Sequence, residues 1–309
     1  LFLRLAWPVR QLVRESRCQL IDAHFGYPEG IVAAMLAAVS GVPFAVTLRG
    51  NEPLHAESAA KRKLLAWSLR RAARVITVSN RLREFAIGLG VAPESIVTIP
   101  NGVDASVFYP LDRAAARLRF GLAEQDRVVL SAGSLIRRKG HHHVLQSLTT
   151  LRRRGVPTVL LIAGGPGREG RFENELLRLA EEENCGDHVR FLGSLSPEDL
   201  AQAMCAADVF CLASSREGWP NVLHEALACG TPAIASDVGA VRDMLPHPEL
   251  GIVVPAPDPI HLVPALERAL GAEWDRSAIA RFGQSRSWQC VASEVLHCFR
   301  QIIQFEAEQ

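Results

Sequence analysis

The fold is decided by residues 127–163, which read RVVLSAGSLIRRKGHHHVLQSLTTLRRRGVPTVLLIA. The stretch opens with the apolar run 127–132, continues through a basic turn and a helix-length segment, and closes with the apolar run 158–163. Continuous runs of Val, Ile and Leu indicate parallel strands that are buried on both faces, and parallel neighbours need a long crossover between them. The stretch therefore predicts a βαβ unit and an α/β protein.

The same alternation extends along the whole chain. The strand-length apolar segments are 20–24, 44–48, 74–78, 96–99, 127–132, 158–163, 188–191, 209–212, 231–235 and 251–254. They predict two Rossmann-like parallel-sheet domains that face a cleft. The alternation is interrupted between Pro100 and Asp126. We therefore expect an N-terminal domain over 1–108, a C-terminal domain over 109–285, and a terminal helix over 286–309 that packs back on the N-terminal domain.

Composition and charge exclude several classes of protein. The chain has 309 residues, of which 48% are hydrophobic and 22% charged, and this excludes a disordered chain. Its formal net charge of +1 argues against a nucleic-acid-binding protein. The sequence also lacks an apolar stretch of about 18 residues that would span a membrane. Residues 1–125 hold 16 Lys+Arg and 10 Asp+Glu, so this half is better suited to an anionic surface or substrate.

Seven cysteines form no Cys-x-x-Cys pair and no metal-ligand spacing with histidine. Several lie in apolar runs, such as Cys211 within 209–212. They predict buried free thiols in a reducing compartment, and hence a cytoplasmic protein.

The most specific motif is 215–225, SREGWPNVLHE, which follows a predicted strand and opens a predicted helix. Pro220 suits the first helical turn, where its missing N–H costs nothing. The next three backbone N–H groups would point out of the helix start and form an anion site. Gly218 lets the backbone approach a ligand closely.

Two carboxylates flank this helix start. Glu225 lies four residues after Asn221, on the same helix face and one turn deeper, where it could accept hydrogen bonds from hydroxyls such as those of a ribose. Glu217, in the preceding loop, could bind a sugar in the same way. The alternative is a capping loop with two solvated glutamates.

The second motif is 129–140, VLSAGSLIRRKG, a strand that continues into three adjacent cations. Such cations repel one another unless they share an anion, which Arg138 could clamp and Lys139 could meet as a point charge. A basic surface turn is an equal alternative for this motif alone. Together with the loop of Glu217, it predicts a diphosphate site.

These motifs resemble the retaining, two-domain (GT-B) glycosyltransferases of family 4, also called group 1. Glu217 and Glu225 have the spacing of the family's Glu-x7-Glu signature, and residues 101–110, NGVDASVFYP, resemble its inter-domain link. The resemblance covers essentially the whole chain.

Two features depart from the family pattern. Ser134 stands where the family often has an arginine, and we expect Arg138 to supply that charge. The sequence opens with LFLR at 1–4, about one βαβ unit after the usual start of the family. We therefore expect the N-terminal domain to be incomplete.

The resemblance implies a hexosyl- or glycosyltransferase that moves a sugar from a UDP- or GDP-sugar, with retention and by front-face displacement. The acceptor would be a hydroxyl of a glycan or a lipid-linked molecule, in polysaccharide, glycolipid or capsule assembly, and neither a metal nor a cofactor is expected. The implied catalytic residues are His24, Glu217 and Lys139. The implied donor-binding residues are Gly133, Ser134, Arg138, Lys139, Glu217, Gly218, Trp219, Pro220, Asn221, Val222, Leu223 and Glu225.

On the acceptor side, the resemblance implies Arg49, Gly50 and Asn51. His24 and Arg49 end consecutive strands, so we expect His24 to orient the donor sugar and Arg49 to hold an anionic acceptor. The alternatives are a histidine bonded to the backbone and a structural ion pair of Arg49.

For three further patterns, we favour a structural interpretation over a functional one. Residues 165–170, GPGREG, fit G-x-G-x-x-G, but no acidic residue ends the next strand, so we do not expect NAD. Residues 61–71, KRKLLAWSLRR, read as a basic amphipathic helix with Trp67 and the leucines on one face. It either lies on a membrane as a peripheral contact or packs on the sheet, and we favour packing. Residues 141–143 are consecutive histidines that point in different directions, which argues against a metal site.

Two other functions stay open. One is a nucleotide-sugar epimerase or a phosphorylase on the same fold, although no lysine context marks a pyridoxal phosphate site. The other is a non-catalytic protein that binds a nucleotide-sugar or acts as a scaffold.

Overall fold

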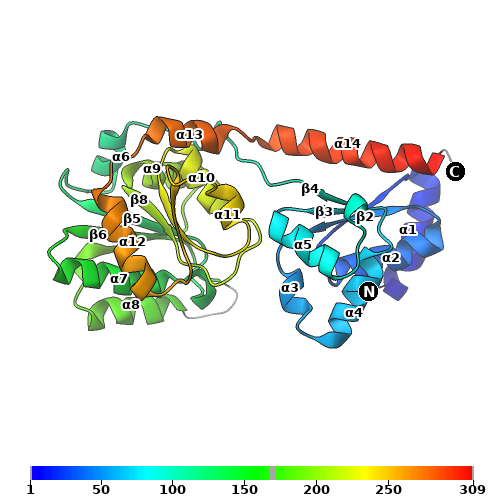
Figure 1. The fold of residues 1–309 in the computed structure, drawn as a ribbon, viewed down its shortest axis with the longest axis horizontal. Coiled ribbons are helices and arrows are strands. Elements are labelled where there is room, and N and C mark those ends of the chain that lie inside the picture. The colour runs from blue at the N-terminus through cyan, green and yellow to red at the C-terminus, as the bar shows by residue number, and fades with distance from the viewer. Residues whose placement is uncertain (1, 168–171, 308–309) are drawn as a thin grey trace. The chain divides into compact units, whose positions relative to one another are not determined.

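The computed structural model describes residues 2–167 and 172–307, and its contacts divide the chain into two units. The first unit contains Leu1–Asn101 and Gln289–Gln309, and the second contains Gly102–Trp288. Each unit is built on a parallel sheet with helices packed against it (Figure 1). The predicted α/β class with two parallel-sheet domains is confirmed.

The first unit has a four-stranded sheet in the order β1-β2-β3-β4. Its strands are β1 (Ile21–His24), β2 (Phe44–Leu48), β3 (Arg74–Thr77) and β4 (Ile96–Thr98). Its helices are α1 (Phe2–Ser16), α2 (Glu29–Ser40), α3 (Glu52–His55), α4 (Ala59–Leu69), α5 (Asn80–Gly88) and α14 (Trp288–Ala307), with a 3-10 turn η1 (Pro93–Ser95). The last helix, α14, buries Cys298 and Ile302 in one cluster with Ala45 and Ile76 of the sheet.

The second unit has a six-stranded sheet in the order β10-β9-β8-β5-β6-β7. Its strands are β5 (Arg127–Ala132), β6 (Thr158–Ala163), β7 (Val189–Gly193), β8 (Val209–Leu212), β9 (Ala233–Ser236) and β10 (Gly251–Val254). The chain builds the sheet outward from β5 to β7 and then returns to the other side of β5 with β8. In open α/β sheets, ligands bind beyond the carboxyl ends of the strands where the order reverses, which here lies between β5 and β8.

Helices cover both faces of this second sheet. They are α6 (Arg113–Arg119), α7 (His141–Arg153), α8 (Phe172–Glu182), α9 (Pro197–Ala206), α10 (Asn221–Ala228), α11 (Val241–Met244), α12 (Pro259–Gly271) and α13 (Arg276–Gln284), with 3-10 turns η2 (Arg137–Lys139) and η3 (Gly186–His188).

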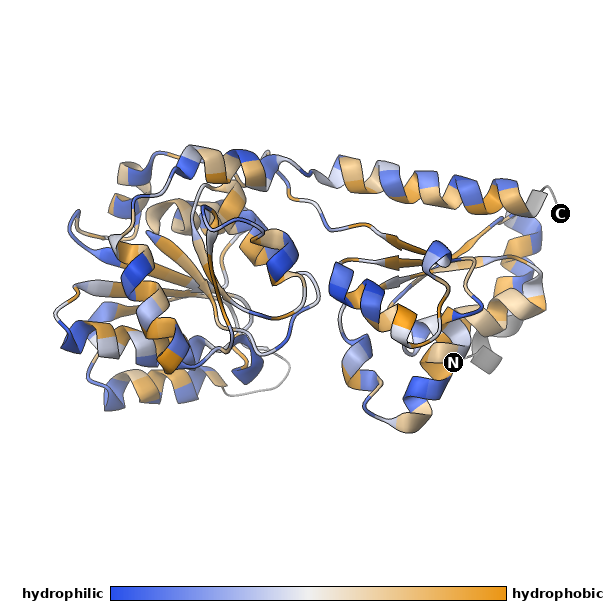
Figure 2. Ribbon diagram, viewed as in Figure 1, coloured by the Kyte–Doolittle hydropathy of each residue, from blue (hydrophilic) through white to orange (hydrophobic). Residues whose placement is uncertain are grey.

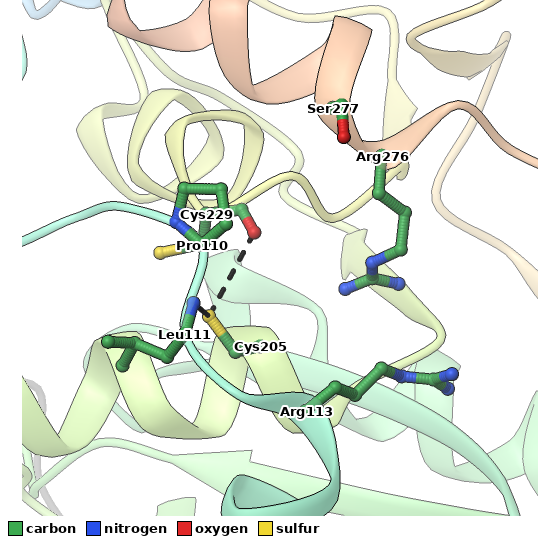
Figure 3. A pocket seen from close by; sticks show the side chains of 7 residues that line it. All are labelled: Pro110, Leu111, Arg113, Cys205, Cys229, Arg276 and Ser277. Carbon is green, nitrogen blue, oxygen red and sulfur yellow. Dashed lines mark hydrogen bonds between the residues drawn. The ribbon is translucent and has the colours of Figure 1, made fainter.

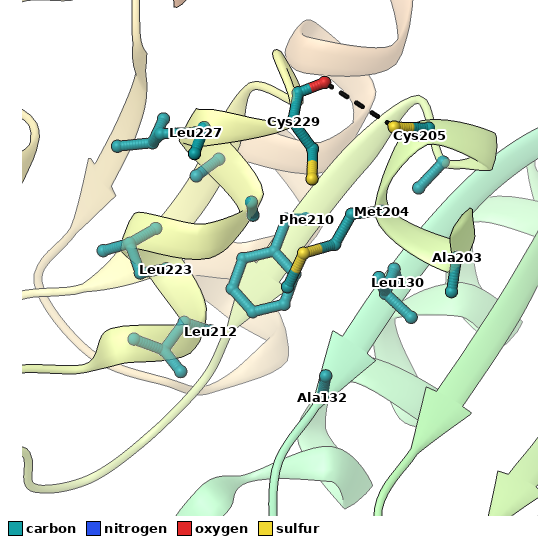
Figure 4. Close-up of a cluster of buried hydrophobic side chains, with 14 of the residues drawn as sticks. Leu130, Ala132, Ala203, Met204, Cys205, Phe210, Leu212, Leu223, Leu227 and Cys229 are labelled. Carbon is teal, nitrogen blue, oxygen red and sulfur yellow. Dashed lines mark hydrogen bonds between the residues drawn. The ribbon is translucent and has the colours of Figure 1, made fainter. Parts of the chain in front are cut away.

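Successive side chains of β5 enter two separate cores, as the two-residue period of a strand requires. Val129 packs in a cluster with α7, α8 and α12, whereas Leu130 packs in a cluster with α9 and α10 (Figure 4). Figure 2 shows the strands as the most continuously apolar part of the unit. Burial on both faces explains why the strand read as a continuous apolar run.

Half of the strands have the predicted limits, and the others differ from them by one or two residues. The segment predicted over 231–235 forms β9 only from Ala233. The N–H of Thr231 donates to Ala226 O (3.0 Å) and its hydroxyl to Met204 O (2.7 Å), so Thr231 belongs to the turn after α10. Pro232, the next residue, has no N–H to offer the sheet.

Candidate functional site

Two loops meet where the strand order of the second unit reverses. One follows β5 and holds η2, and the other follows β8 and leads to α10. Gly140 ends η2 with φ +71°, and a Cβ there would lie 1.8 Å from the carbonyl oxygen of Ala213. The N–H of Ser215 donates to Arg138 O (2.9 Å). The two loops are therefore packed backbone against backbone.

A charged cluster joins these loops. Lys139 Nζ lies 2.6 Å from Glu217 Oε1, and the Ser214 hydroxyl donates to the same oxygen at 2.7 Å. Arg138 Nη1 lies 3.8 Å from Glu217 Oε2 and donates to Arg216 O at 2.6 Å. The Glu217 side chain is only 9% exposed, so this ion pair is poorly screened by solvent. The two predicted motifs are thus brought together, with Glu217 between the cations.

Neighbouring glycines hold the backbone around this cluster. Gly133 has φ +142° and packs against the stem of Lys139, where a Cβ would lie 3.5 Å from Lys139 Cδ. Gly239, at φ +55°, lies so close to the other loop that a Cβ would be 2.5 Å from Glu217 O. The next N–H, of Ala240, donates to Gly218 O (2.9 Å). Ser134 is exposed beside this cluster.

Helix α10 begins at Asn221, with Pro220 as its N-cap residue instead of a residue of the first turn. The prediction that three N–H groups point outward is wrong for Leu223, because its N–H donates to Pro220 O at 2.9 Å. That bond closes a tight turn at the helix start. Asn221 is exposed and Val222 is half-buried, so the outward end of α10 consists of these two residues.

Glu225 lies one turn into α10 and is largely withdrawn from solvent. Burial raises the pKa of its carboxyl group to about 7. Among the residues that the structure describes, none donates a hydrogen bond to this carboxylate. Such a group gains from any hydroxyl that reaches it, because a hydrogen bond would replace the lost solvation.

Two aromatic side chains pack against each other at the start of α10. The rings of Trp219 and His224 meet edge to face, with centroids 5.9 Å apart. Burial lowers the pKa of His224 to about 4, so its imidazole is neutral at pH 7. The Trp219 side chain thus packs toward α10 and shapes the loop that leads into this helix.

The three consecutive histidines start α7, behind the loop of Lys139. His141 is buried, and its Nδ1 lies 2.9 Å from the Ser131 hydroxyl. Burial lowers the pKa values of His141 and His142 to about 4. Within residues 2–167 and 172–307, no group of three His, Cys, Asp or Glu side chains could hold a metal ion.

The predicted acceptor-side residues lie in the first unit, at the carboxyl ends of β1 and β2. Arg49 Nη2 lies 2.7 Å from His24 Nδ1, and Arg49 Nη1 donates to Asn101 Oδ1 at 3.3 Å. His24 Nε2 lies 3.1 Å from Asp22 Oδ2. Burial lowers the pKa of Arg49, which stays far above neutrality in any protein. His24 is therefore bonded to side chains, not to the backbone.

Glu52 was missed by the sequence analysis. It is only 1% exposed, and its carboxylate accepts from the backbone N–H groups of Gly26 (3.0 Å), Arg49 (3.3 Å) and Gly50 (2.7 Å). It therefore holds the loops after β1 and β2 together. Asn51, the N-cap residue of α3, is exposed. The only sequence signal for Glu52 was an acidic residue after a glycine at a strand end.

Helix α4 differs from the predicted amphipathic helix. Leu65 and Leu69 are fully buried, whereas Leu64 is 45% exposed, so the leucines do not share one face with Trp67. Arg71 stacks on the Trp67 ring at 4.8 Å. No helix within the described ranges 2–167 and 172–307 is long and apolar enough to cross a membrane.

The G-x-G-x-x-G segment is only partly described. Gly165 and Gly167 pack against Ser194 and Ile136, and Pro166 bridges to Leu135. The rest of the motif, from residue 168 on, lies outside the described residues.

The family models that match this chain and the relatives described here are all glycosyltransferases. Residues 112–286 match the family model of the glycosyl transferases group 1, and residues 1–107 match that of glycosyltransferase family 4. A D-inositol 3-phosphate glycosyltransferase of Jonesia denitrificans is 32% identical over 237 residues, which are 73% of this chain and 56% of the relative. A protein of the same name from Mycobacterium bovis is 33% identical over 76% of this chain and 50% of its own length. The chain thus spans about half the length of these curated relatives.

Solved structures share the fold. HepE of Anabaena in complex with UDP gives a TM-score of 0.86 at 20% identity, covering 96% of this chain and 82% of HepE. Sucrose-phosphate synthase of Thermosynechococcus elongatus gives a TM-score of 0.79 at 23% identity, covering 98% of this chain and 78% of the synthase. Both likenesses confirm the GT-B fold. Together with the family models and the paired glutamates, they show that this chain belongs to the group 1, or family 4, glycosyltransferases.

Proposed function

We propose that the chain is a retaining glycosyltransferase that takes its sugar from a nucleoside-diphosphate sugar without the help of a metal. The observation that carries the proposal is the cluster of Lys139, Arg138 and Glu217 between β5 and β8. The family membership supports it, as do the titles of HepE structures, which describe complexes with UDP and UDP-glucose.

Lys139 and Arg138 would bind the diphosphate and stabilise the charge that develops on it as the sugar leaves. Both cations now face the Glu217 carboxylate. A diphosphate carries more charge than one carboxylate and can accept from both cations at once. The start of α10, at Asn221 and Val222, would add the positive end of a helix dipole. Preorganised donors of this kind commonly supply the largest part of catalysis.

The two glutamates would bind hydroxyls. When the diphosphate takes over Lys139, Glu217 becomes available to the hydroxyls of the donor sugar, next to Gly218. Glu225, whose carboxylate receives no donor within the described chain, would hold the ribose. Neither glutamate would need to meet the phosphates directly, so the site separates acceptors of hydrogen bonds from the cations.

The first unit would contribute the acceptor side. The relatives are named for D-inositol 3-phosphate, an acceptor that carries a phosphate. Arg49 is the cation of the group at the ends of β1 and β2, and Gly50 and Asn51 lie next to it. We propose that this group holds an anionic hydroxyl acceptor and that His24 orients the donor sugar. Polysaccharide or glycolipid assembly, with peripheral membrane contact, is the wider setting that we propose.

The proposal is tested by transfer in the presence of a chelator. The chain would be incubated with UDP-glucose or a GDP-sugar and with inositol 3-phosphate, and the anomeric configuration of the product read by NMR. We expect release of the nucleoside diphosphate and an α-linked product from an α-linked donor. Lys139→Ala should abolish transfer. Arg137→Ala is the matched control, because Arg137 lies in the same turn but pairs with Glu175.

Each other outcome has a definite meaning. A β-linked product would contradict retention. Transfer that requires a divalent ion would contradict the metal-free mechanism. Nucleotide binding without transfer to any acceptor would favour the non-catalytic alternative.

A further inference from the structure

Two cysteines of the second unit lie side by side in its core, away from the loops of the donor site. Cys205 belongs to the last turn of α9, and Cys229 caps the end of α10. Each is about 2% exposed. The Cys205 thiol donates to the carbonyl oxygens of Tyr109 (3.5 Å) and Cys229 (3.9 Å), and both cysteines line one pocket (Figure 4). Two elements that are distant in sequence thus bring these two residues together.

The surroundings of Cys205 favour a thiolate. The N–H of Leu111 donates to Cys205 Sγ at 3.3 Å. The guanidinium of Arg276 lines the same pocket and is held by Ala207 O and the Thr231 hydroxyl (Figure 3). An N–H donor and a nearby cation are what stabilise reactive thiolates.

Two carboxylates act near the pocket, Asp208 on Arg276 and Glu225 on Cys229. Asp208, three residues after Cys205, pairs with Arg113 and with Arg117, the latter at 3.4 Å. Asp208, whose charge acts on Arg276, is therefore already shared by two arginines. A thiolate at Cys205 would offset the buried charge of Arg276.

A pocket gives small molecules a route to this sulfur. It has about 290 Å³ of space that protein atoms do not fill, part of it open to solvent, and is lined by Pro110, Leu111, Arg113, Cys205, Cys229, Arg276 and Ser277. The side chain of Arg113 is 42% exposed, so the pocket reaches the surface there.

The two thiols differ in acidity. The neighbouring Cys229 thiol, with help from the Leu111 N–H and Arg276, outweighs burial and lowers the pKa of Cys205. The neighbouring Cys205 thiol and burial raise the pKa of Cys229. Cys205 is thus the more acidic thiol of the two and the one that would react first.

We propose that Cys205 and Cys229 form a redox-active dithiol, which a small hydroperoxide oxidises to an intramolecular disulfide. The Cys205 thiolate attacks the terminal oxygen of the hydroperoxide, so that an S–O bond forms as the O–O bond breaks and Cys205 becomes a sulfenic acid. The alkoxide or hydroxide that is released takes a proton and leaves as an alcohol or water. Cys229 then attacks the sulfenic sulfur and forms the disulfide, with release of its thiol proton and the hydroxyl as water. The two thiols lose two electrons, and the hydroperoxide gains them.

The bond would tie α9 to the last turn of the helix that carries Glu225. The N–H of Cys229 donates to Glu225 O at 3.1 Å, so Cys229 is one hydrogen bond away from that residue's backbone. The proposal itself does not depend on what the donor site binds.

The test uses the full chain with Cys290→Ser, which removes the most exposed cysteine and with it the main site for disulfides between chains. After hydrogen peroxide treatment at pH 7, peptide mapping should find Cys205 linked to Cys229. Cys211, whose pKa burial raises to about 12, should remain reduced and serves as an internal control. Oxidation of Cys290 in the unmodified chain confirms that the reagent is active.

Two further measurements separate this chemistry from adventitious oxidation. In Cys229→Ser, dimedone should trap a sulfenic acid at Cys205. The rate of Cys205 modification should rise with pH around a midpoint below that of an ordinary cysteine, which is about 8.5. The proposal is overturned if both cysteines stay reduced while Cys290 is oxidised, or if Cys205 reacts with an ordinary midpoint and no link to Cys229.

Discussion

Replacing Glu225 by glutamine should stabilise the free chain at alkaline pH while it weakens nucleotide binding. Burial raises the pKa of Glu225 from 4.5 to about 7 in the folded state. Between pH 4.5 and pH 7, this carboxyl group therefore keeps its proton in the folded state but loses it in the unfolded state. Folding is most favoured below pH 4.5 and loses stability as the pH rises toward 7.

The size of this effect follows from the shift in pKa. A rise of about 2.5 in the pKa lowers the free energy of unfolding by ~3 kcal/mol at pH 8, but by less than about 1 kcal/mol at pH 5. The amide of Glu225→Gln carries no charge, so the variant should avoid this penalty. We expect the second unit of Glu225→Gln to be more stable than the natural chain by about 3 kcal/mol at pH 8.

The assay is hydrogen exchange of the β5 and β8 amides, compared between variant and natural chain at pH 5 and pH 8. Glu181→Gln is the matched control, since Glu181 is also helical but exposed. Nucleotide affinity should move the other way, with UDP bound about tenfold more weakly by Glu225→Gln, because an amide offers only one acceptor oxygen to two hydroxyls. Equal stability at both pH values, or unchanged UDP affinity, would refute this reasoning.

Three other substitutions have definite expected outcomes. Glu217→Gln should raise the affinity for UDP about tenfold, because it releases Lys139, and should lower the rate of sugar transfer; calorimetry and a transfer assay measure the two effects. Gly140→Ala places a Cβ 1.8 Å from Ala213 O at a positive φ, and urea unfolding should show a loss of about 3 kcal/mol, whereas Gly155→Ala adds a Cβ that meets no atom within 4 Å and should cost less. Glu52→Ala leaves three N–H groups without their acceptor and should destabilise the first unit by about 4 kcal/mol, against little change for the exposed Glu57→Ala.

The strands could be predicted because their signal is local. After the exposed Arg127, every position of β5 is apolar or small, as burial on both faces requires. The limits were less certain where a side chain changes the end of an element. Thr231 is β-branched, as strand residues often are, but its hydroxyl donates a hydrogen bond to Met204 O.

The motifs and their meeting at one site were predicted, but the direct ion pair between Lys139 and Glu217 was not. Lys139 and Glu217 are 78 residues apart, and their contact depends on β8 returning to lie beside β5. Strand order is set by packing across the whole unit and leaves no mark at either residue. The raised pKa of Glu225 has the same origin, since it results from burial by other elements.

Some residues carry little sequence signal for the role they take. The sequence shows Glu52 only as an acidic residue after a strand end, yet its carboxylate accepts three backbone hydrogen bonds. The prediction that the leucines of α4 share one face with Trp67 was also wrong, because the buried face of α4 is set by the elements that pack against it. The sequence of one helix does not show which of its faces is buried until its neighbours are placed.

The central proposal is that Lys139 binds the diphosphate of a nucleotide without a metal. Calorimetric titration with UDP and with GDP, in the presence of a chelator, tests it directly on the natural chain, Lys139→Ala and Arg137→Ala. We expect one of the two nucleotides to bind, Lys139→Ala to weaken that binding about thirtyfold, or ~2 kcal/mol, and Arg137→Ala to leave it nearly unchanged. Equal affinities for the two variants, or no binding by a folded natural chain, would contradict the proposed donor site.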